Sequence, residues 1–210
     1  MRFAEAAKIA PILADLELDF DKLVEVVRSA DRERALCNAN DPKGFDLIVM
    51  NAKVARGLRD QFCGERWERD ETDNQPGIRN SFLKKRIIPC NFDMQAGQID
   101  GPDPTNLTEK GSASKKKVRC NLTPWIPGLP DPSDGETDDE NGYVTYVLGS
   151  YWSADHGLRA ELSRPKAFAS GRYTRFETRI ILLNGSENPA GDFKTDRVPT
   201  EVVDIAIKRK

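Results

Sequence analysis

The alternation of apolar and polar residues between 143 and 182 constrains the fold of this chain more than any other feature. One part of it reads Leu158, Arg159, Ala160, Glu161, Leu162 and Ser163. Because successive side chains of a strand point to opposite faces, a period of two predicts a strand with one buried face. A second strand is predicted over 143–152, and the turn residues of 153–157 join the two strands as a hairpin.

Two more segments show the same period. Residues 174–182 place Phe, Ile and Leu side chains on one side and charged side chains on the other, and residues 203–208 repeat the pattern. Antiparallel sheets commonly bury one face and leave the other in water, which is the origin of such alternation. We therefore predict at least four strands in one mainly antiparallel sheet.

The N-terminal part is predicted to be helical. Residues 3–16 approximate one apolar face, although Pro11 lacks an amide hydrogen and should kink or split that helix. A second helix is predicted to begin near Asp19 or Asp21, because either carboxylate can accept a hydrogen bond from a free amide of the first turn.

A third helix is predicted over 42–62, with Asp41 as its N-cap and a proline in its first turn. Three polar residues on this helix are candidates for a site: Asn51, Arg56 and Arg59. A polar residue close to an apolar stripe either bonds a neighbouring helix or lines a pocket. The sequence leaves both possibilities open.

The middle of the chain carries weaker signals. Residues 78–92 are predicted to form a short helix that turns into a strand, and Pro89 favours an edge position for that strand. After a loop over 94–114, a short strand is predicted over 118–122. Residues 127–141 contain several carboxylates and no basic residue, which is typical of a solvated loop.

These elements predict an α+β fold in which N-terminal helices pack on a mainly antiparallel sheet with long polar loops. The predicted parts are a helical part (1–64), a mixed, loop-rich connection with short strands (65–142) and an antiparallel part (143–210). A chain of 210 residues is long enough to bury about 70% of its extended surface, so we expect one compact domain.

Composition excludes several classes of protein. Lys and Arg number 32 and Asp and Glu 34, so the net charge favours no particular partner. No apolar stretch reaches the roughly 18 residues that cross a bilayer, so no membrane contact and a cytoplasmic location are expected. The cysteines form no CxxC pair, and the motifs of dinucleotide enzymes, P-loop ATPases, serine hydrolases and zincins are missing. No cofactor and no metal site are predicted.

A local excess of basic residues marks the strongest candidate site. The segment between 158 and 180 contains six basic residues and only two glutamates, and aromatic residues are interleaved with them. Guanidinium groups can neutralise phosphates while rings stack on bases. The predicted nucleic-acid contacts are Arg159, Arg164, Lys166, Arg172, Tyr173, Arg175 and Arg179, with Trp125 as a second ring. The alternative is a solvated strand face on which Arg and Glu pair across the sheet.

A second candidate is the group Asp155, His156 and Glu161 at the predicted hairpin turn. A histidine beside carboxylates could act as a general base or help to hold a divalent cation. The arrangement resembles that of restriction-like nucleases, but the lysine that should follow the acid by two residues is missing, because Ser163 stands there.

Two short lysine-rich runs could extend a positive surface. One is Lys84, Lys85 and Arg86, and the other comprises Lys115, Lys116, Lys117 and Arg119. Lysine runs in loops are also common as solubilising surface charge.

The leading hypothesis is a non-catalytic nucleic-acid-associated binding module that contacts the phosphates of DNA or RNA through the basic strand face. A protein-interaction or assembly module of a bacterial or phage system is the alternative from another class. A divalent-metal-dependent nuclease that uses Asp155, His156 and Glu161 is the third.

Overall fold

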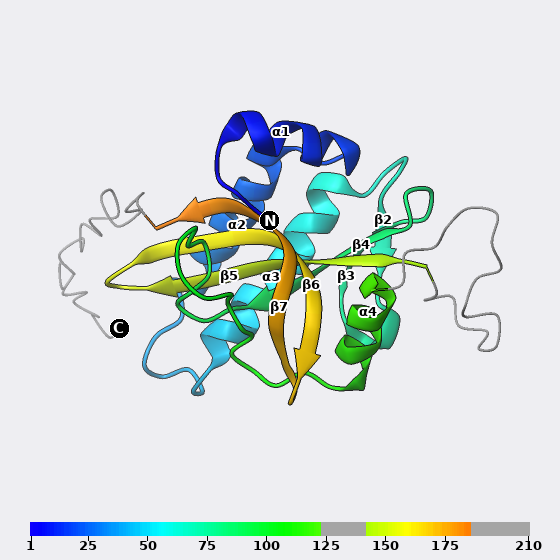
Figure 1. The fold of residues 1–210 in the computed structure, drawn as a ribbon. Coiled ribbons are helices and arrows are strands. Elements are labelled where there is room, and N and C mark those ends of the chain that lie inside the picture. The colour runs from blue at the N-terminus through cyan, green and yellow to red at the C-terminus, as the bar shows by residue number, and fades with distance from the viewer. Residues whose placement is uncertain (123–141, 186–210) are drawn as a thin grey trace, which may run out of the picture.

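The computed structural model describes residues 1–122 and 142–185 (Figure 1). In chain order the elements are β1 (Arg2–Phe3), α1 (Ala6–Asp15), α2 (Phe20–Arg34), α3 (Phe45–Phe62), β2 (Glu68–Asp70), the 3-10 turn η1 (Thr72–Asn74), β3 (Gly77–Asn80), β4 (Lys85–Asn91), α4 (Ser112–Leu122), β5 (Val144–Ser153), β6 (Gly157–Ala169) and β7 (Arg172–Asn184).

The strands of the described residues form one sheet in the order β1-β7-β6-β5-β4-β3-β2. Two of the pairings are parallel, β1 with β7 and β4 with β5, and the other four are antiparallel. The parallel pairing of β4 with β5 requires a crossover, and α4 lies in the connection between them. The predicted α+β fold with a mainly antiparallel sheet is confirmed.

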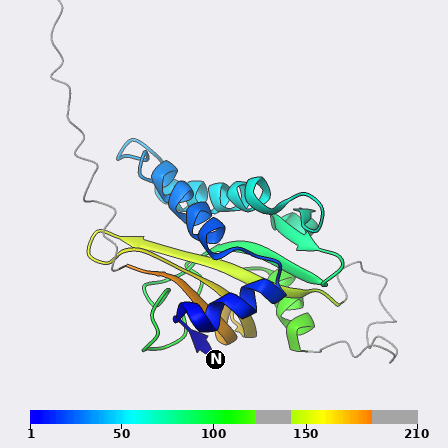
Figure 2. The ribbon, with the colours of Figure 1, turned by 90° about the horizontal axis from the view of Figure 1, so that it is seen from above.

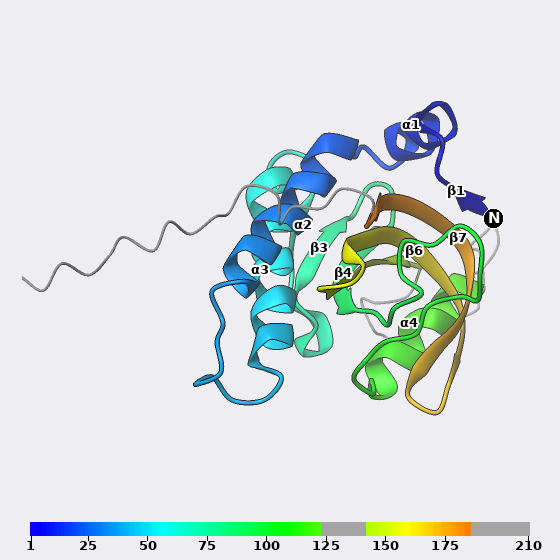
Figure 3. The ribbon, with the colours of Figure 1, turned by 90° about the vertical axis from the view of Figure 1, so that its left-hand side faces the viewer.

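Helices cover both faces of the sheet. Figures 2 and 3 show α2 and α3 on one side and α4 on the other, where β6 and β7 curl around it. Each face has its own apolar core: Ile87 and Leu148 belong to the core under α2 and α3, whereas Ile88 and Val147 belong to the core beside α4. Neighbouring residues of one strand thus contribute to opposite cores, as the strand period requires.

The start of α2 agrees with the sequence. Asp19 has extended backbone, and its carboxylate accepts a hydrogen bond of 2.9 Å from the amide of Lys22. This contact satisfies one of the free amides of the first turn. The buried residues of the helix include Leu23, Val27 and Ala30, whose spacing of three and four residues places them on one side.

The predicted start of α3 is wrong. The helix begins at Phe45 with Gly44 as its N-cap, and Gly44 has a positive φ of 80°. Residues 42–45 form a turn in which the Phe45 amide donates to the Pro42 carbonyl at 3.0 Å. Because the left-handed Gly44 cannot continue a right-handed helix, Asp41 lies outside it, and its carboxylate accepts from the amide of Asn38 instead.

The strand predicted over 118–122 is also wrong, because these residues form the last part of α4. The buried residues Ser114, Lys117, Val118 and Asn121 have helical spacing. Asn121 then bonds the sheet: its amide donates to the carbonyls of Thr145 and Pro165 at 2.9 Å, and its oxygen accepts from the Thr145 amide at 2.7 Å. Such a contact has no signature in a five-residue sequence window.

The helix predicted at the start of 78–92 is wrong, because residues 78–80 belong to β3 and residues 81–84 form a turn. The strand that follows is an inner one. Residues 81–84 connect β3 to β4, and the Asn80 side chain accepts from the amides of Phe82 and Leu83. Pro89 does not lie in an edge strand, because β4 pairs with both β3 and β5. The ladder with β3 ends at Ile87, so the missing amide hydrogen of Pro89 costs no strand pairing on that side.

The hairpin of β5 and β6 confirms the predicted pair, with Ser153 opposite Gly157 at its end. The strand predicted over 174–182 is confirmed as part of β7. The strand predicted over 203–208, the acidic stretch 127–141 and Trp125 lie outside the described residues.

Gly149 of β5 lies against the ring of Phe92, and both are buried. A Cβ atom at Gly149 would lie 2.0 Å from two atoms of that ring. Gly149→Ala is therefore expected to lower the free energy of unfolding by about 1–3 kcal/mol, because the ring must move within a filled core. Urea denaturation measures the change.

The matched control is Gly111→Ala, since a Cβ atom there meets no atom within 4 Å; its effect should stay within about 0.5 kcal/mol. In a Phe92→Leu background, Gly149→Ala should lower the free energy of unfolding by less than it does in the wild type, because the smaller leucine side chain can move away from the new Cβ atom. Equal costs in both backgrounds would argue against the contact.

Candidate functional site

The predicted basic strand face is largely buried or paired within the molecule. Arg179 of β7 is 1% exposed and Glu161 of β6 is fully buried. Their side chains form an ion pair with two contacts, of 2.6 and 2.9 Å. The expectation that Arg179 points into solvent is therefore wrong.

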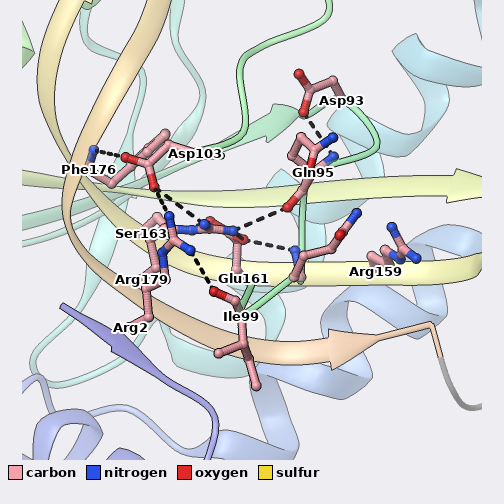
Figure 4. Close-up of polar contacts among 12 residues, drawn as sticks. Arg2, Asp93, Gln95, Ile99, Asp103, Arg159, Glu161, Ser163, Phe176 and Arg179 are labelled. Atoms are coloured by element: carbon pink, nitrogen blue, oxygen red, sulfur yellow. Dashed lines mark hydrogen bonds and ion pairs between the residues drawn. The ribbon is translucent and has the colours of Figure 1, made fainter. Parts of the chain in front are cut away.

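Figure 4 shows that this ion pair holds a loop against the sheet. Glu161 also accepts from the amide of Gly97 at 2.8 Å and from the hydroxyl of Ser163 at 2.6 Å. Arg179 donates to the Gln95 carbonyl at 3.2 Å and lies 3.4 Å from Asp103. The two charges thus bind both ends of the segment 95–103.

The same segment is tied to the N-terminal strand. Asp103 pairs with Arg2 at 3.1 Å and accepts from the Phe176 amide at 3.1 Å, and Arg2 donates to the Ile99 carbonyl at 2.6 Å. Because all these groups have partners, the network satisfies charges that would be costly to bury alone. These ion pairs and hydrogen bonds therefore stabilise the fold.

Three further arginines of the predicted face also make contacts within the chain. Arg159 donates to the Met94 carbonyl at 2.7 Å, and Arg172 donates to the Asn106 carbonyl. Arg164 pairs with Glu177 at 3.2 Å, which is the cross-strand pairing that the alternative interpretation of this face predicts.

Tyr173, the ring predicted to stack on a base, is buried between Phe168 and Phe176. Burial raises the pKa of its hydroxyl well above the usual value. Of the seven residues predicted to contact nucleic acid, Lys166 and Arg175 alone are exposed and make no hydrogen bond or ion pair with another described residue.

The residues Asp155, His156 and Glu161 do not form one site. Asp155 lies exposed at the β5–β6 turn, whereas Glu161 is buried within the ion pair with Arg179. The His156 amide donates to the Ser153 hydroxyl at 3.2 Å. Within 1–122 and 142–185, no group of three His, Cys, Asp or Glu residues could hold a metal ion.

The lysine-rich runs contribute buried charges as well as exposed ones. Arg86 and Asp70 are each 1% exposed in their side chains and form an ion pair, and Lys117 pairs with Asp73 at 3.0 Å. Burial alone would raise the pKa of Asp70, but hydrogen bonds from Thr72 and the charge of Arg86 outweigh it and lower that pKa. These two runs therefore do not form a continuous basic rim.

A cleft between α3 and β2 concentrates accessible positive charge. Its volume is about 410 Å³, and its charged lining residues are Arg56, Arg59, Asp60 and Arg69. The lining thus contains three arginines and one aspartate. A volume of this size is typical of clefts that bind small molecules or parts of larger ones.

The three arginines differ in how far their donors are used. Arg59 is held by the carbonyls of Gly77 and Asp70, at 3.2 and 3.0 Å, and pairs with Glu71 at 2.7 Å. It therefore joins α3 to β2 and β3. Arg56 lies 3.3 Å from Asp60 across one turn of the exposed side of α3. This surface pair is weak and leaves most of its donors available.

Arg69 is the most available of the three. It lies exposed on β2, and its guanidinium makes no hydrogen bond or ion pair with another described residue. The sequence named Arg56 and Arg59 as candidates for a site on the third helix, but it contains no local signal that brings Arg69 beside them.

Comparison with known proteins gave no match: no protein family, no curated protein and no solved structure is significantly similar to the chain. Among the described helices, none has the length and apolar character needed to span a bilayer. The geometry of the site alone therefore carries the functional argument.

Proposed function

We propose that the chain is a non-catalytic nucleic-acid-binding module whose phosphate contacts lie in the cleft between α3 and β2. The observation that carries this proposal is the convergence of Arg56, Arg59 and Arg69 on one cavity with a single aspartate in its lining. A guanidinium presents donors in a planar fork that matches two phosphate oxygens. Phosphate binding is thus the chemistry that this lining favours most.

The proposal moves the contact surface away from the strand face that the sequence indicated. On that face Arg159, Arg164 and Arg179 already bond other groups of the chain. Breaking such contacts would offset the gain from a phosphate. In the cleft, Arg69 has no competing partner among the described residues, and Arg56 has only an exposed one.

Two double variants separate the two surfaces. Arg56→Gln with Arg69→Gln should weaken binding to single-stranded DNA or RNA. It should also flatten the plot of log affinity against log salt by about 0.7 for each phosphate that is no longer neutralised. Fluorescence anisotropy at two salt concentrations measures both quantities. Arg59 is left unchanged because it holds β2 and β3 in place.

The matched control is Lys166→Gln with Arg175→Gln, which removes the same charge from the strand face. It should leave affinity and salt dependence unchanged. If the control weakens binding and the cleft variant does not, the strand face is the contact surface and our proposal is wrong. Binding that is absent at low salt for single strands and duplexes alike would also overturn it.

A protein-interaction module is the second candidate, because three apolar side chains lie exposed around the α2–α3 connection. Leu36 is 75% exposed, Ile48 64% and Phe45 38%. Phe45 and Ile48 are three residues apart on α3 and therefore share one side of the helix. Apolar groups that gather in this way on a surface are typical of protein contacts.

A further inference from the structure

A second, smaller cavity lies beside the arginine cleft, and Pro76 lines both. Its volume is about 80 Å³, and its polar side chains come from three parts of the fold. Asn51 belongs to α3, Tyr173 to β7 and Ser114 to the first turn of α4. Asn74 of η1 and, from the connecting segments, Gln75 and Lys110 complete the polar lining.

Two polar atoms of the cavity are buried without a hydrogen-bond partner among the described residues. They are Oδ1 of Asn51 and Oε1 of Gln75. A buried polar atom without a partner costs about 1–3 kcal/mol, and native proteins contain few of them. Two such atoms beside one cavity indicate that a polar ligand completes their hydrogen bonding.

The amide groups can present donors to this ligand. The Gln75 amide nitrogen donates to the Ser114 hydroxyl oxygen at 2.8 Å. If the amide turns by 180°, its oxygen accepts from the same hydroxyl, and the NH₂ group faces the cavity. The two orientations have the same shape and number of hydrogen bonds. The amide of Asn51 also has two orientations of the same shape, and turning it presents the NH₂ group in place of the oxygen that has no partner among the described residues.

The charge of the lining favours an anion. Lys110 carries the one formal charge among the lining residues, and no carboxylate lines the cavity within the described part of the chain. Burial keeps Tyr173 protonated, because it raises the pKa of the hydroxyl. The amides of the first turn of α4, which begins at Ser112, contribute further positive potential.

The size of the cavity limits the anion. Because a water molecule occupies about 30 Å³ in the liquid, the cavity of about 80 Å³ corresponds to two or three waters. A tetrahedral oxyanion fits this space, whereas a nucleobase or sugar does not. We propose that the cavity is a binding site for one phosphate group, held by Lys110 and by the amides of Asn51 and Gln75.

Inorganic phosphate is the probe for this site. Isothermal titration calorimetry at constant ionic strength should show saturable binding to the whole chain, and one site should remain in the variant with Arg56→Gln and Arg69→Gln, whose cleft has lost two of its three arginines. Lys110→Gln should raise the dissociation constant roughly 10- to 100-fold, because one charge-assisted hydrogen bond is removed. The matched control Lys115→Gln removes an exposed lysine from α4 and should leave the constant unchanged.

A second variant keeps the test valid if Lys110→Gln unfolds. Asn51→Asp preserves the side-chain shape and places a negative charge in the cavity, so it should abolish phosphate binding. Circular dichroism verifies the fold of each variant. Wild-type protein that shows no saturable phosphate binding, or folded Lys110→Gln and Asn51→Asp variants that bind as the wild type does, would overturn the proposal.

The source of the phosphate is decided by comparing three probes. They are inorganic phosphate, a 5′-phosphorylated dinucleotide and the same dinucleotide without the terminal phosphate, each titrated against the variant with Arg56→Gln and Arg69→Gln so that the cleft does not contribute. Tighter binding of the phosphorylated dinucleotide than of inorganic phosphate assigns the site to a terminal phosphate, and the reverse order assigns it to the free ion. The cleft variant with Arg56→Gln and Arg69→Gln should still bind inorganic phosphate, so failure of the proposed function would leave this inference standing.

Discussion

Arg179→Met is expected to lower the free energy of unfolding by about 3–5 kcal/mol, measured by urea denaturation. The substitution keeps much of the side-chain volume but leaves the carboxylate of Glu161 buried without its ionic partner. Glu161 is fully buried, so water cannot take the place of the guanidinium. The segment 95–103 would also lose the donor that holds the Gln95 carbonyl.

The matched control lies four residues earlier on the same strand. Arg175 is exposed, and Arg175→Met should change the stability by no more than about 0.5 kcal/mol. In a double variant, Glu161→Gln should recover part of the stability that Arg179→Met removes, because no unpaired charge remains buried. Equal effects of Arg175→Met and Arg179→Met would mean that Arg179 is accessible to water.

Asp70→Asn is expected to have an effect of similar size, about 3–5 kcal/mol at neutral pH, because it removes the carboxylate charge that pairs with the buried guanidinium of Arg86. Arg86 is 1% exposed. Asparagine keeps the shape of the side chain, so the change reports mainly on charge. Urea denaturation at pH 7 measures it, with Asp60→Asn in the exposed pair with Arg56 as the control, which should cost at most about 1 kcal/mol.

The effect of Asp70→Asn should also depend on pH. Although burial raises the pKa of Asp70, its hydrogen bonds from Thr72 and the charge of Arg86 lower it further, below the usual value. A carboxyl group with a lowered folded pKa stabilises the fold above its unfolded pKa of about 3.9, and this contribution disappears as pH falls through the folded value. The wild type should thus lose part of its advantage over the variant below about pH 4. An advantage that is constant from about pH 5 to about pH 2.5 would contradict the lowered pKa.

Local sequence patterns were sufficient where a segment has one buried face and a capping residue of its own. The alternation around Leu158, Ala160 and Leu162 predicted β6, since these three side chains are buried in the core. Asp19 predicted the start of α2, since its carboxylate contacts an amide only three residues away. In both places the decisive contact is local or follows directly from the period.

The same reasoning failed where the decisive contact is distant. Val118 and its neighbours lie in α4, and Asn121 anchors this helix to Thr145 and Pro165, which come later in the chain. Asp41 is a suitable N-cap by residue type, yet the left-handed conformation of Gly44 moves the helix start beyond it. Residue type and spacing do not contain this information.

For the site, the sequence by itself determined which residues carry charge, and its period of two predicted the same side of β7 for Arg175 and Arg179. In the structure the pairing of β7 with β6 skips Glu177, between Phe176 and Thr178, and such a bulge turns the residues beyond it to the other face. Arg175 is exposed, whereas Arg179 is 1% exposed and pairs with Glu161. The segment 95–103 covers only part of the strand, and this is a property of the tertiary structure. Likewise the pairing of β2 with β3 brings Arg69 to the cleft beside α3. Burial decides whether an arginine bonds the chain or remains available to a ligand, because an unpaired charge is tolerated in water and not in the interior.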